Sequence, residues 1–290
     1  MAGSLYVVST PIGNLDDMTV RAVNTLKSVA VVAAEDTRRT GLLLRHFGIA
    51  TPTTSLHEHN ETRKIPALLE TLAEGRDIAI VSDAGTPLVC DPGQRLVAAA
   101  IQQNIAVIPI PGASAILAGL AASGYPAEQF VFAGFAPSRS KDRKGWLQQL
   151  SLEPRTVIFF DAPHRITSTI TDIFAVFGNR PITIARELTK LHETVIHTTA
   201  NQLTLFNIPA RGEFTIILGP APPAAAVHQV VDDEALRAYF DQMTEVNAMP
   251  RRAAIVATGK LFGLSPNEVY ARLERVKAAH LDRSDNDLLP

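Results

Sequence analysis

The sequence predicts an α/β fold of two domains, followed by a small helical segment. Three observations lead to this prediction. Residues 4–122 alternate short apolar runs with longer segments of helical periodicity, and residues 123–220 repeat the alternation after a turn-rich join, SGYP at 123–126. Residues 228–290 show helical periodicity only. Such an alternation is typical of a mostly parallel sheet with helices on both faces.

The expected strands are continuous apolar runs, which a sheet covered on both faces requires. In the first block we expect strands at residues 5–10, 29–36, 78–83 and 105–110, and helices at 19–29, 38–48, 61–75, 93–103 and 112–123. In the second block we expect strands at 130–135, 155–162, 181–187, 193–199 and 213–219, and a helix at 164–177. The stretch PAPPAAAV at 220–227 reads as a linker. The predicted domains are therefore 1–122, 123–220 and 228–290.

The composition is that of an ordinary globular protein: 290 residues, 46% hydrophobic, with a net charge of -2. One cysteine, Cys90, excludes a disulfide framework and a thiolate zinc site, as expected in a reducing cytosol. No apolar stretch reaches the roughly 18–20 residues of a membrane span, and no basic leader precedes an apolar run. We therefore expect a cytoplasmic protein without membrane contact.

Three small polar loops follow predicted strands: TPIGN at 10–14, SDAGTPLVCDPG at 82–93 and PGASA at 111–115. Ligands bind at the carboxyl ends of strands in a sheet of this kind. The glycines and prolines hold tight turns and let backbone N–H groups approach a ligand. Asp83 adds a carboxylate and Ser114 a hydroxyl. Each loop alone is explained by strand-to-helix turn chemistry, but three together predict a concave site for a small polar molecule.

The first turn is not a phosphate cradle, because G-x-G-x-x-G is absent and no Lys-Ser/Thr pair follows Gly13. A site with an acidic side chain and several backbone donors suits a zwitterion, such as the amino-acid end of S-adenosylmethionine. The stretch HEHN at 57–60 does not match H-E-x-x-H, so we expect a solvated loop there and no metal site.

Contact with a polyanion must come from local basic patches, because the net charge is close to zero. The stretch PSRSKDRKG at 137–145 is expected to be a flexible loop, with four basic residues against one acidic: Arg139, Lys141, Arg143 and Lys144 against Asp142. Arg38 and Arg39 in AEDTRRT are further candidates for RNA contact. A solvated charged loop is the alternative.

The second patch lies at 251–280, where six Lys/Arg stand against two Glu. It reads as helix, turn and helix, with Ser265 as N-cap and Pro266 at the first helical position. Helix-turn-helix modules have this pattern, and its candidate RNA-binding residues are Arg251, Arg252 and Lys260. A packing or dimer element is the alternative.

Seven ordered motifs resemble the tetrapyrrole methylase superfamily: STPIGNLDDMT, AAEDTRRTGLLL, VSDAGTPLVCDPG, PIPGASA, FFDAPHR, ARELTKLHET and RGEFTIILG. They are most similar to its ribosomal RNA small subunit methyltransferase I branch, which methylates a cytidine 2'-hydroxyl in the decoding centre of 16S rRNA. The resemblance covers about residues 4–219. It implies two α/β domains with S-adenosylmethionine in the cleft between them, usually in a homodimer, and the small ribosomal subunit as partner.

The resemblance also implies which residues bind the cofactor. Pro11 and Gly13 belong to the cleft loop where the methyl acceptor meets the cofactor. The methionine part is expected to contact Asp83, Gly85, Thr86, Ser114 and Ala115. The adenosine part is expected to contact Phe160, Ala162, Pro163 and Leu188, with Glu213 closing that side. Ala162 and Cys90 stand where relatives often carry serine, so backbone contacts are expected there instead of hydroxyl hydrogen bonds.

Transfer of a methyl group from a sulfonium requires an acceptor oxygen held in line and a dry site, and a base that takes the hydroxyl proton helps. The candidate bases are four carboxylates: Glu35, Asp36, Glu187 and Glu193. For each of them the alternative is a salt bridge to a neighbouring Arg38, Arg39, Arg186 or Lys190.

Two other functions stay open. A precorrin C-methyltransferase or a diphthine synthase would share the cofactor loops without needing the basic loop or the C-terminal helices. A non-catalytic RNA-binding protein would retain the fold without cofactor affinity. The two basic patches favour RNA as the substrate.

Overall fold

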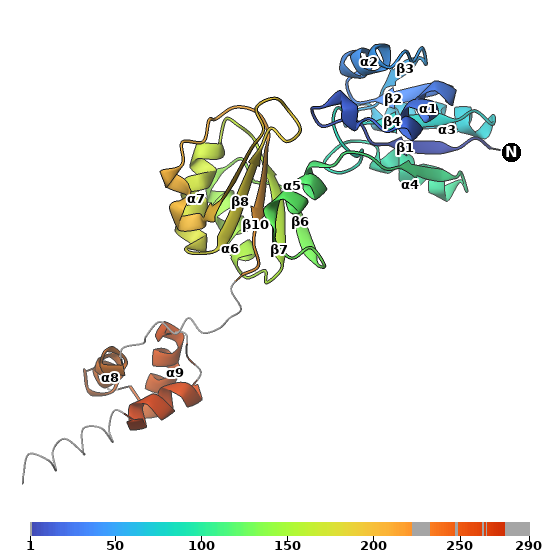
Figure 1. Cartoon of the computed structure of the whole chain (residues 1–290). Helices are drawn as coiled ribbons and strands as arrows, with labels where there is room; N and C mark the ends of the chain where they lie inside the picture. The colour runs from blue at the N-terminus through green and yellow to red at the C-terminus, as the bar shows by residue number, and fades with distance from the viewer. Residues whose placement is uncertain (1, 222–232, 247–248, 263, 265, 276–290) are drawn as a thin grey trace, which may run out of the picture. The chain divides into compact units, whose positions relative to one another are not determined.

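The computed structural model describes residues 2–221, 233–246, 249–262, 264 and 266–275. The chain divides into two compact units, at residues 1–221 and 222–290 (Figure 1). Two five-stranded sheets lie within the described part of the first unit. The described part of the second unit is helical, so the predicted change from α/β to helix is confirmed.

The first sheet is entirely parallel, with strand order β3-β2-β4-β1-β5. In the register, Leu5 of β1 pairs with Ile78 of β4 and Val107 of β5. The strands are β1 (Leu5–Val8), β2 (Val31–Ala34), β3 (Thr53–Ser55), β4 (Ile78–Val81) and β5 (Val107–Ile110). Four were predicted. The pattern did not predict β3, because three polar residues show no apolar run.

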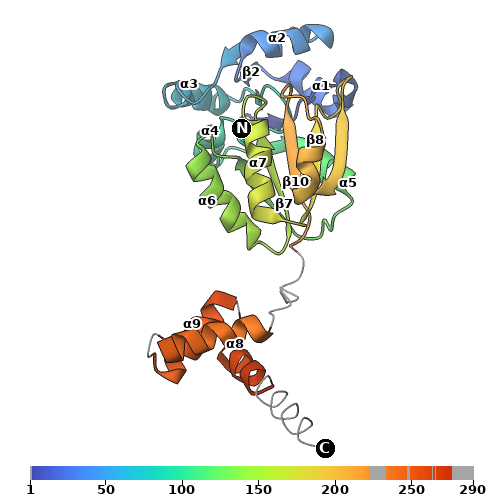
Figure 2. The same cartoon turned by 90° about the vertical axis from the view of Figure 1, so that its left-hand side faces the viewer.

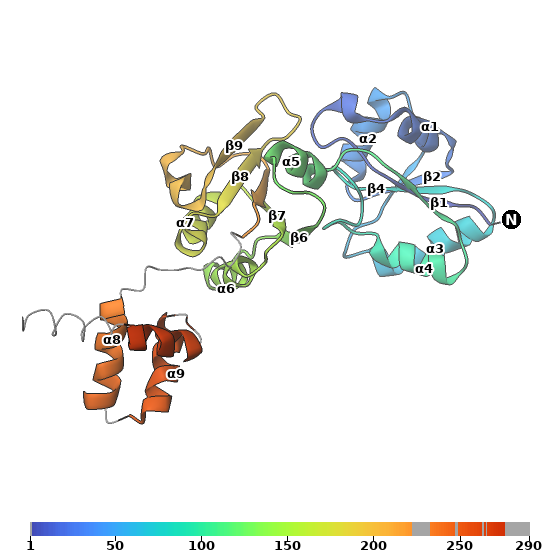
Figure 3. The ribbon, with the colours of Figure 1, turned by 60° about the horizontal axis from the view of Figure 1, so that its bottom comes forward.

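Helices cover both faces of the first sheet, as the apolar strands require. They are α1 (Val20–Ser28), α2 (Thr37–His46), α3 (Glu61–Ala73) and α4 (Gln94–Gln102), with a 3-10 turn η1 (Leu15–Asp17). Figure 3 shows α1 and α2 on one side of the sheet and α3 and α4 on the other. Leu26 and Leu44 pack on the first face, and Leu72 and Leu96 pack on the second.

Local side chains fix where these helices begin. The Thr19 hydroxyl accepts the Ala22 N–H at 3.1 Å, and the Asp36 carboxylate accepts the Arg38 N–H at 2.9 Å. These are N-caps, which satisfy helix donors that have no partner within the helix. The buried Glu61 does the same for α4 by accepting the N–H groups of Arg95 and Leu96.

The second sheet is mixed, with strand order β6-β7-β10-β8-β9. Only β6 and β7 are parallel, and the other neighbours are antiparallel. The strands are β6 (Phe130–Phe135), β7 (Thr156–Asp161), β8 (Pro181–Arg186), β9 (Thr194–Thr199) and β10 (Phe214–Leu218). The apolar pattern predicted all five to within two residues.

The second sheet also has helices on both faces: α5 (Ala115–Ser123), α6 (Ser140–Ser151), α7 (Ile166–Phe177) and the 3-10 segment η2 (Ala200–Leu205). Figure 2 shows α6 and α7 side by side, and they pack with η2 on one face of the sheet. Leu120 of α5 packs on the other face against Ile158 and Ile217. Since α5 packs on the second sheet, we propose that the second domain begins before α5 rather than after residue 122.

The prediction of a flexible loop at 137–145 is wrong from Ser140 onward, because these residues form the first half of α6. Arg143 is 1% exposed and pairs with Asp172 of α7 at 2.8 Å. Its other donors reach the Pro137 and Ser138 carbonyls. The side chain therefore ties the start of α6 to α7 and does not reach solvent, which removes Arg143 from the RNA-binding candidates.

In the second unit the described elements are α8 (Asp233–Asp241), the π-helical segment η3 (Gln242–Val246), α9 (Arg251–Phe262) and a helix at 266–275. Their shared core consists of Leu236, Phe240, Ala254, Val269 and Leu273. The predicted N-cap Ser265 and most of the predicted linker at 220–227 lie outside the described residues. Among the described helices, none has both the length and the apolar character needed to cross a bilayer.

Candidate functional site

The three polar loops meet at the carboxyl edge of the first sheet, because β4, β1 and β5 are neighbours. Thr10 and Gly85 exchange two backbone hydrogen bonds, at 2.9 and 3.0 Å. The Ser9 and Thr86 hydroxyls are hydrogen bonded at 2.9 Å. Gly85 adopts φ +79°, which glycine tolerates far better than other residues. The loops thus form one connected surface.

A cavity of about 290 Å³, which we call cavity 1, lies against this surface within the first unit. Its lining includes five of the predicted cofactor contacts of the first block: Asp83, Gly85, Thr86, Ser114 and Ala115. The second block contributes Phe135, Phe160, Asp161, Glu213, Phe214 and Thr215. Ser114 is also the N-cap of α5. Cavity 1 therefore has walls from both sheets.

A second cavity of about 450 Å³, cavity 2, lies beside cavity 1. The two cavities share five of their lining residues: Ile12, Arg39, Asp83, Ala84 and Glu213. Pro11 and Gly13 line cavity 2 only, as do His46 and Lys190. A ligand in cavity 1 and a ligand in cavity 2 would therefore lie on the two sides of one set of side chains.

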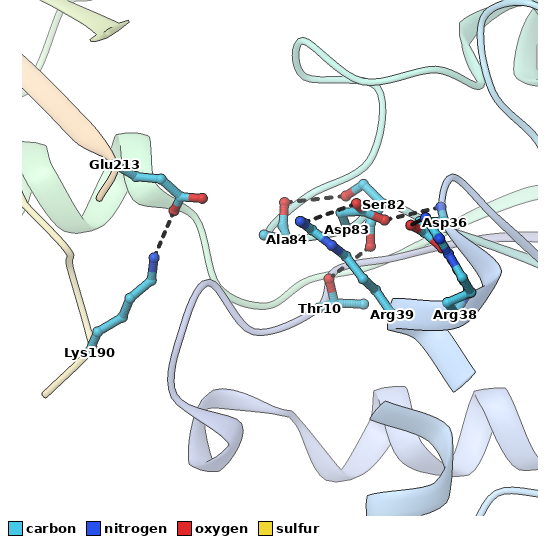
Figure 4. A network of polar contacts seen from close by, with 9 residues as sticks. All are labelled: Thr10, Asp36, Arg38, Arg39, Ser82, Asp83, Ala84, Lys190 and Glu213. Atoms are coloured by element: carbon cyan, nitrogen blue, oxygen red, sulfur yellow. Dashed lines mark hydrogen bonds and ion pairs between the residues drawn. The ribbon is translucent and has the colours of Figure 1, made fainter. Parts of the chain in front are cut away.

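Asp83 is held in place by the loop between β2 and α2 (Figure 4). One carboxylate oxygen accepts the Asp36 N–H at 3.1 Å, and the other lies 3.2 Å from the Arg39 guanidinium. Asp36 itself pairs with Arg38 at 2.8 Å. The hydrogen bonds from Arg38 hold the pKa of Asp36 well below its usual range. Asp36 is thus occupied as a helix cap and ion-pair partner, which makes it a poor base.

Two carboxylates in cavity 1 have no ion pair among the described residues: Glu35 and Asp91. Burial raises the pKa of Glu35, and the negative charges of Asp91 and Asp83 add to this. Burial also raises the pKa of Asp91. A hydrogen bond from Ser82 lowers this pKa, and the negative charge of Asp83 raises it further. The first-sheet side of cavity 1 therefore carries excess negative charge, which a cationic ligand would neutralise.

Lys190 bridges two carboxylates at the edge of cavity 2. Its Nζ lies 2.8 Å from Glu187 and 3.1 Å from Glu213, the second of these contacts being drawn in Figure 4. The pKa of Glu187 lies below its usual value, mainly because Lys190 donates a hydrogen bond to the carboxylate. Glu187 and Thr189 have φ +55° and +68°, a conformation that is costly for non-glycine residues. Such strain persists only where surrounding contacts impose it.

The four candidate bases occupy different places. Glu35 lines cavity 1. Asp36 and Glu187 are in ion pairs with Arg38 and Lys190, as the alternative interpretation expected. The exposed Glu193 accepts the Thr189 N–H and lines neither cavity.

The remaining cofactor candidates are divided. Phe160 and Glu213 line cavity 1, whereas Ala162, Pro163 and Leu188 line neither cavity. Leu188 is buried in the apolar cluster that contains Ile12 and α5. The roles of all these residues stay predictions.

The basic candidates are mostly at the surface of their own unit. Arg38, Arg39, Arg139, Lys141 and Lys144 are exposed, and so are Arg251 and Arg252 in the second unit. Lys144 also lies 3.6 Å from Asp172, and Arg251 pairs with Glu274. The Lys260 side chain lies outside the described residues.

The sequence reasoning missed two acidic residues of cavity 1, Asp91 and Asp161. Asp161 ends β7 just as Asp83 follows β4, so a carboxylate at the end of a predicted strand was the available signal. At 57–60 the Asn60 side chain accepts the His57 N–H, which closes a turn before α3. No group of side chains suited to a metal ion occurs among the described residues.

Comparison with known proteins identifies the family. The family Tetrapyrrole (Corrin/Porphyrin) Methylases matches residues 4–204. The chain belongs to this family. It is 42% identical over 288 residues to a protein of Haemophilus influenzae named Ribosomal RNA small subunit methyltransferase I, covering 98% of this chain and 99% of that one. A Synechocystis protein of the same name is 50% identical over 225 residues, covering 76% of this chain and 80% of that one. The chain is thus a methyltransferase.

Solved structures support the tetrapyrrole methylase fold. Uroporphyrin-III C-methyl transferase from Thermus thermophilus complexed with S-adenyl homocysteine matches with TM-score 0.52 and 18% identity, over 75% of this chain and 97% of that one. A putative diphthine synthase from Entamoeba histolytica matches with TM-score 0.53 and 14% identity, over 77% and 94%. At these identities the likeness shows the fold alone, and it does not distinguish between acceptors.

Proposed function

We propose that this methyltransferase transfers a methyl group from S-adenosylmethionine to the 2'-hydroxyl of a cytidine in the decoding centre of 16S rRNA. The observation that carries the proposal is the pair of adjoining cavities, which share Arg39, Asp83 and Glu213. One cavity is acidic and the other has basic groups at its edge. This arrangement suits a cationic donor beside a phosphate-bearing acceptor.

Cavity 1 fits the cofactor. Glu35 and Asp91 supply uncompensated negative charge for a sulfonium and an ammonium group. Gly85 lines the cavity without a side chain and with φ +79°, so its backbone allows close approach of a ligand. The aromatic rings of Phe135 and Phe160, with centroids 5.3 Å apart, give the opposite wall a surface for a purine. The bound cofactor would supply an activated methyl group.

Cavity 2 is the proposed site of the acceptor nucleotide. Arg39, His46 and Lys190 line it and can meet the phosphates on either side of a ribose. The side chains of Leu42 and Leu43 from α2 provide apolar surface for the base. The shared residues between the cavities then hold the 2'-oxygen towards the methyl group and exclude water.

Glu35 is the proposed base among the four carboxylates. It lines cavity 1 and lacks an ion pair among the described residues, whereas Asp36 and Glu187 are neutralised by basic partners. Its raised pKa brings the carboxylate closer to the operating pH, which improves a general base. The hydroxyl proton would pass to the Glu35 carboxylate as the bond between the 2'-oxygen and the methyl carbon forms and the methyl–sulfur bond breaks, which leaves S-adenosylhomocysteine.

We also propose that the substrate is the assembled small subunit, met in the cytoplasm by a homodimer of this chain. A net charge of -2 with two basic patches is too little to bind bare RNA tightly. The names of relatives with 41–50% identity support rRNA over a tetrapyrrole or a diphthine precursor. A non-catalytic RNA-binding role is disfavoured by the acidic cavity 1, which RNA would not fill.

The test uses small ribosomal subunits from cells that lack this protein. We expect methyl transfer to these particles, little to bare 16S rRNA, and none to particles with a 2'-deoxy nucleotide at the target. The labelled position should resist alkaline hydrolysis, because a 2'-O-methyl group prevents attack on the adjacent phosphate. Methylation of the deoxy particle would reject the 2'-O assignment. Absence of S-adenosylmethionine binding in calorimetry would instead support the non-catalytic alternative.

A further inference from the structure

Asp161 has an unusual position in cavity 1. It is the last residue of β7, its side chain is 0% exposed, and it lines the cavity on the second-sheet side. One oxygen, Oδ1, accepts the Ala162 N–H at 2.9 Å and the Arg165 Nε–H at 2.5 Å. The other oxygen, Oδ2, has no hydrogen-bond partner among the described residues. A buried carboxylate oxygen without a donor is costly, so it needs an explanation.

The charge on Asp161 is already compensated, unlike that of Glu35 and Asp91. Arg165 lies at the start of α7, is 15% exposed and forms an ion pair with Asp161. The Glu35 and Asp91 carboxylates have no such partner among the described residues and suit a cation. Oδ2 of Asp161 therefore lacks a hydrogen-bond donor, whereas the negative charge of the carboxylate is already paired.

The surroundings of Asp161 indicate what kind of donor fits. Phe160 precedes it and lines the same cavity, and the Phe160 ring contacts those of Phe132 and Phe135. Phe214 pairs with Asp161 across the sheet and also lines the cavity. Aromatic walls bind a planar ring, so Asp161 lies at the end of cavity 1 that suits a nucleoside.

We propose that Asp161 is a specificity-determining residue for the methyl donor. Its Oδ2 accepts a hydrogen bond from an uncharged N–H or O–H of the adenosine part, either the exocyclic amine or a ribose hydroxyl. This rests on the proposed function, which places the cofactor in cavity 1. Arg165 is a positioning residue, because its hold on Oδ1 directs Oδ2 to the ligand.

The substitution Asp161→Asn tests this directly. Arg165 and the Ala162 N–H both donate, so they select the amide oxygen of the new side chain. Its NH₂ group then replaces Oδ2, and a donor of the ligand meets a donor of the protein. We expect S-adenosylhomocysteine to bind about tenfold more weakly to Asp161→Asn in calorimetry, as for a lost hydrogen bond to a charged group.

Ligand analogues separate this role from a structural one. The probes are the inosine analogue of S-adenosylhomocysteine, which lacks the exocyclic amine, and its 2'-deoxy and 3'-deoxy analogues. We expect the wild type to lose about tenfold in affinity for the analogue that lacks the recognised donor. Asp161→Asn should bind that analogue and the parent equally. The analogue that shows this pattern identifies the donor.

Arg165→Gln is the matched control, since it removes the ion pair and keeps the carboxylate. Its selectivity among the analogues should persist in part, while the absolute affinity falls. The proposal is overturned if the wild type binds all analogues equally, a measurement that requires no variant to fold. It is also overturned if Asp161→Asn loses the same factor for every ligand. Failure of the wild type to bind S-adenosylhomocysteine at all would reject the proposed function instead.

Discussion

Glu35 and Asp91 show at the scale of single residues that side chains of the site lower the stability of the fold at neutral pH. Both carboxylates are held in cavity 1 near Asp83, and neither has an ion-pair partner among the described residues. Their raised pKa values mean that the folded protein binds protons more readily than the unfolded chain. Such groups favour the folded state at low pH and lose that contribution as the pH rises. At neutral pH they therefore reduce stability, in exchange for affinity towards a cation.

The first prediction concerns the pH dependence of cofactor binding. Because the pKa values of Glu35 and Asp91 lie above those of ordinary carboxyls, their protonation begins nearer to neutral pH. We expect affinity for S-adenosylmethionine to fall on acidification before ordinary carboxyls titrate. Glu35→Gln and Asp91→Asn should each flatten the profile measured by calorimetry. S-Adenosylhomocysteine, which lacks the sulfonium charge, should show a weaker dependence. A profile unchanged in both variants would contradict the role of these two carboxylates.

The same pKa shifts predict the effect on stability. Glu35→Gln removes a charge that the fold holds unfavourably, so the variant should unfold at a higher temperature than the wild type at neutral pH. The difference should shrink as the pH is lowered and the wild-type carboxyl becomes neutral. Thermal unfolding at a series of pH values measures this. A variant that is less stable at every pH would show that Glu35 makes a structural contact instead.

Gly13 gives another residue-scale prediction. A Cβ at this position would collide with Cγ of Lys190, whose Nζ is fixed by Glu187 and Glu213. Gly13→Ala should therefore displace Lys190 and destabilise the protein by about 1–3 kcal/mol, the range for overpacking. Methyl transfer should fall as well, because Lys190 lines cavity 2. Thermal unfolding and transfer to small subunits are the measurements.

Two further variants test this explanation. Lys190→Ala removes the Cγ that collides, so the double variant should regain stability relative to Gly13→Ala alone. Gly145→Ala is the matched control: it lies exposed in α6 with no atom near the added Cβ. A glycine in a helix interior costs about 1 kcal/mol relative to alanine, so this control should be slightly stabilising. A double variant no better than Gly13→Ala would point to another clash.

At the scale of elements, α6 shows where a sequence pattern gives the wrong structure. Ser140–Ser151 begins with five charged or polar residues and contains Gly145, which resembles a solvated loop. The helix forms because Leu147 and Trp146 pack on the second sheet and Arg143 reaches Asp172 of α7. That partner lies 29 residues away, so no local pattern could reveal it.

A prediction at the scale of elements separates structural charge from RNA-binding charge around α6. Asp172→Asn leaves the buried Arg143 without a counterion, so it should cost about 3–5 kcal/mol of unfolding free energy. The exposed Arg139 and Lys141, which form no ion pair among the described residues, can be changed to Glu at a cost of only about 0.5 kcal/mol each. These surface changes should instead weaken binding to small subunits. Each lost phosphate contact should reduce the log–log salt slope by about one unit. An unchanged slope would identify the patch as solvated surface.

The strands and the cavities differ in how far the sequence determines them. The apolar runs at 78–83 and 213–219 predicted β4 and β10 because a strand buried on both faces is a local pattern. Three polar loops likewise predicted the first-sheet wall of cavity 1. Asp161 was missed although its place at the end of a predicted strand was a local signal. That Asp91 and Asp161 line the same cavity depends on how the two sheets and their loops meet, which no short stretch encodes. For Asp36 the sequence left a base and a salt bridge to Arg38 both open, and the structure contains the ion pair and the helix cap.

At the scale of the whole molecule, the chain consists of two units with separate apolar cores. The clusters of the first unit contain no residue beyond Leu218, and that of the second unit contains none before Leu236. Both cavities are lined only by residues of the first unit. Cofactor binding should therefore be a property of the first unit, whatever the second unit does.

The last prediction tests that division with a chain that ends at Ala221. It should fold and bind S-adenosylhomocysteine as tightly as the full chain, because its cores and both cavities are complete. Methyl transfer to small subunits should fall on the order of tenfold, since the exposed Arg251 and Arg252 are lost as phosphate contacts. The full chain with both arginines changed to Glu is the control, and it should lose transfer without losing cofactor affinity. If the shortened chain methylates subunits at the full rate, the second unit is a packing or dimer element, and the basic residues of the first unit must account for RNA binding by themselves.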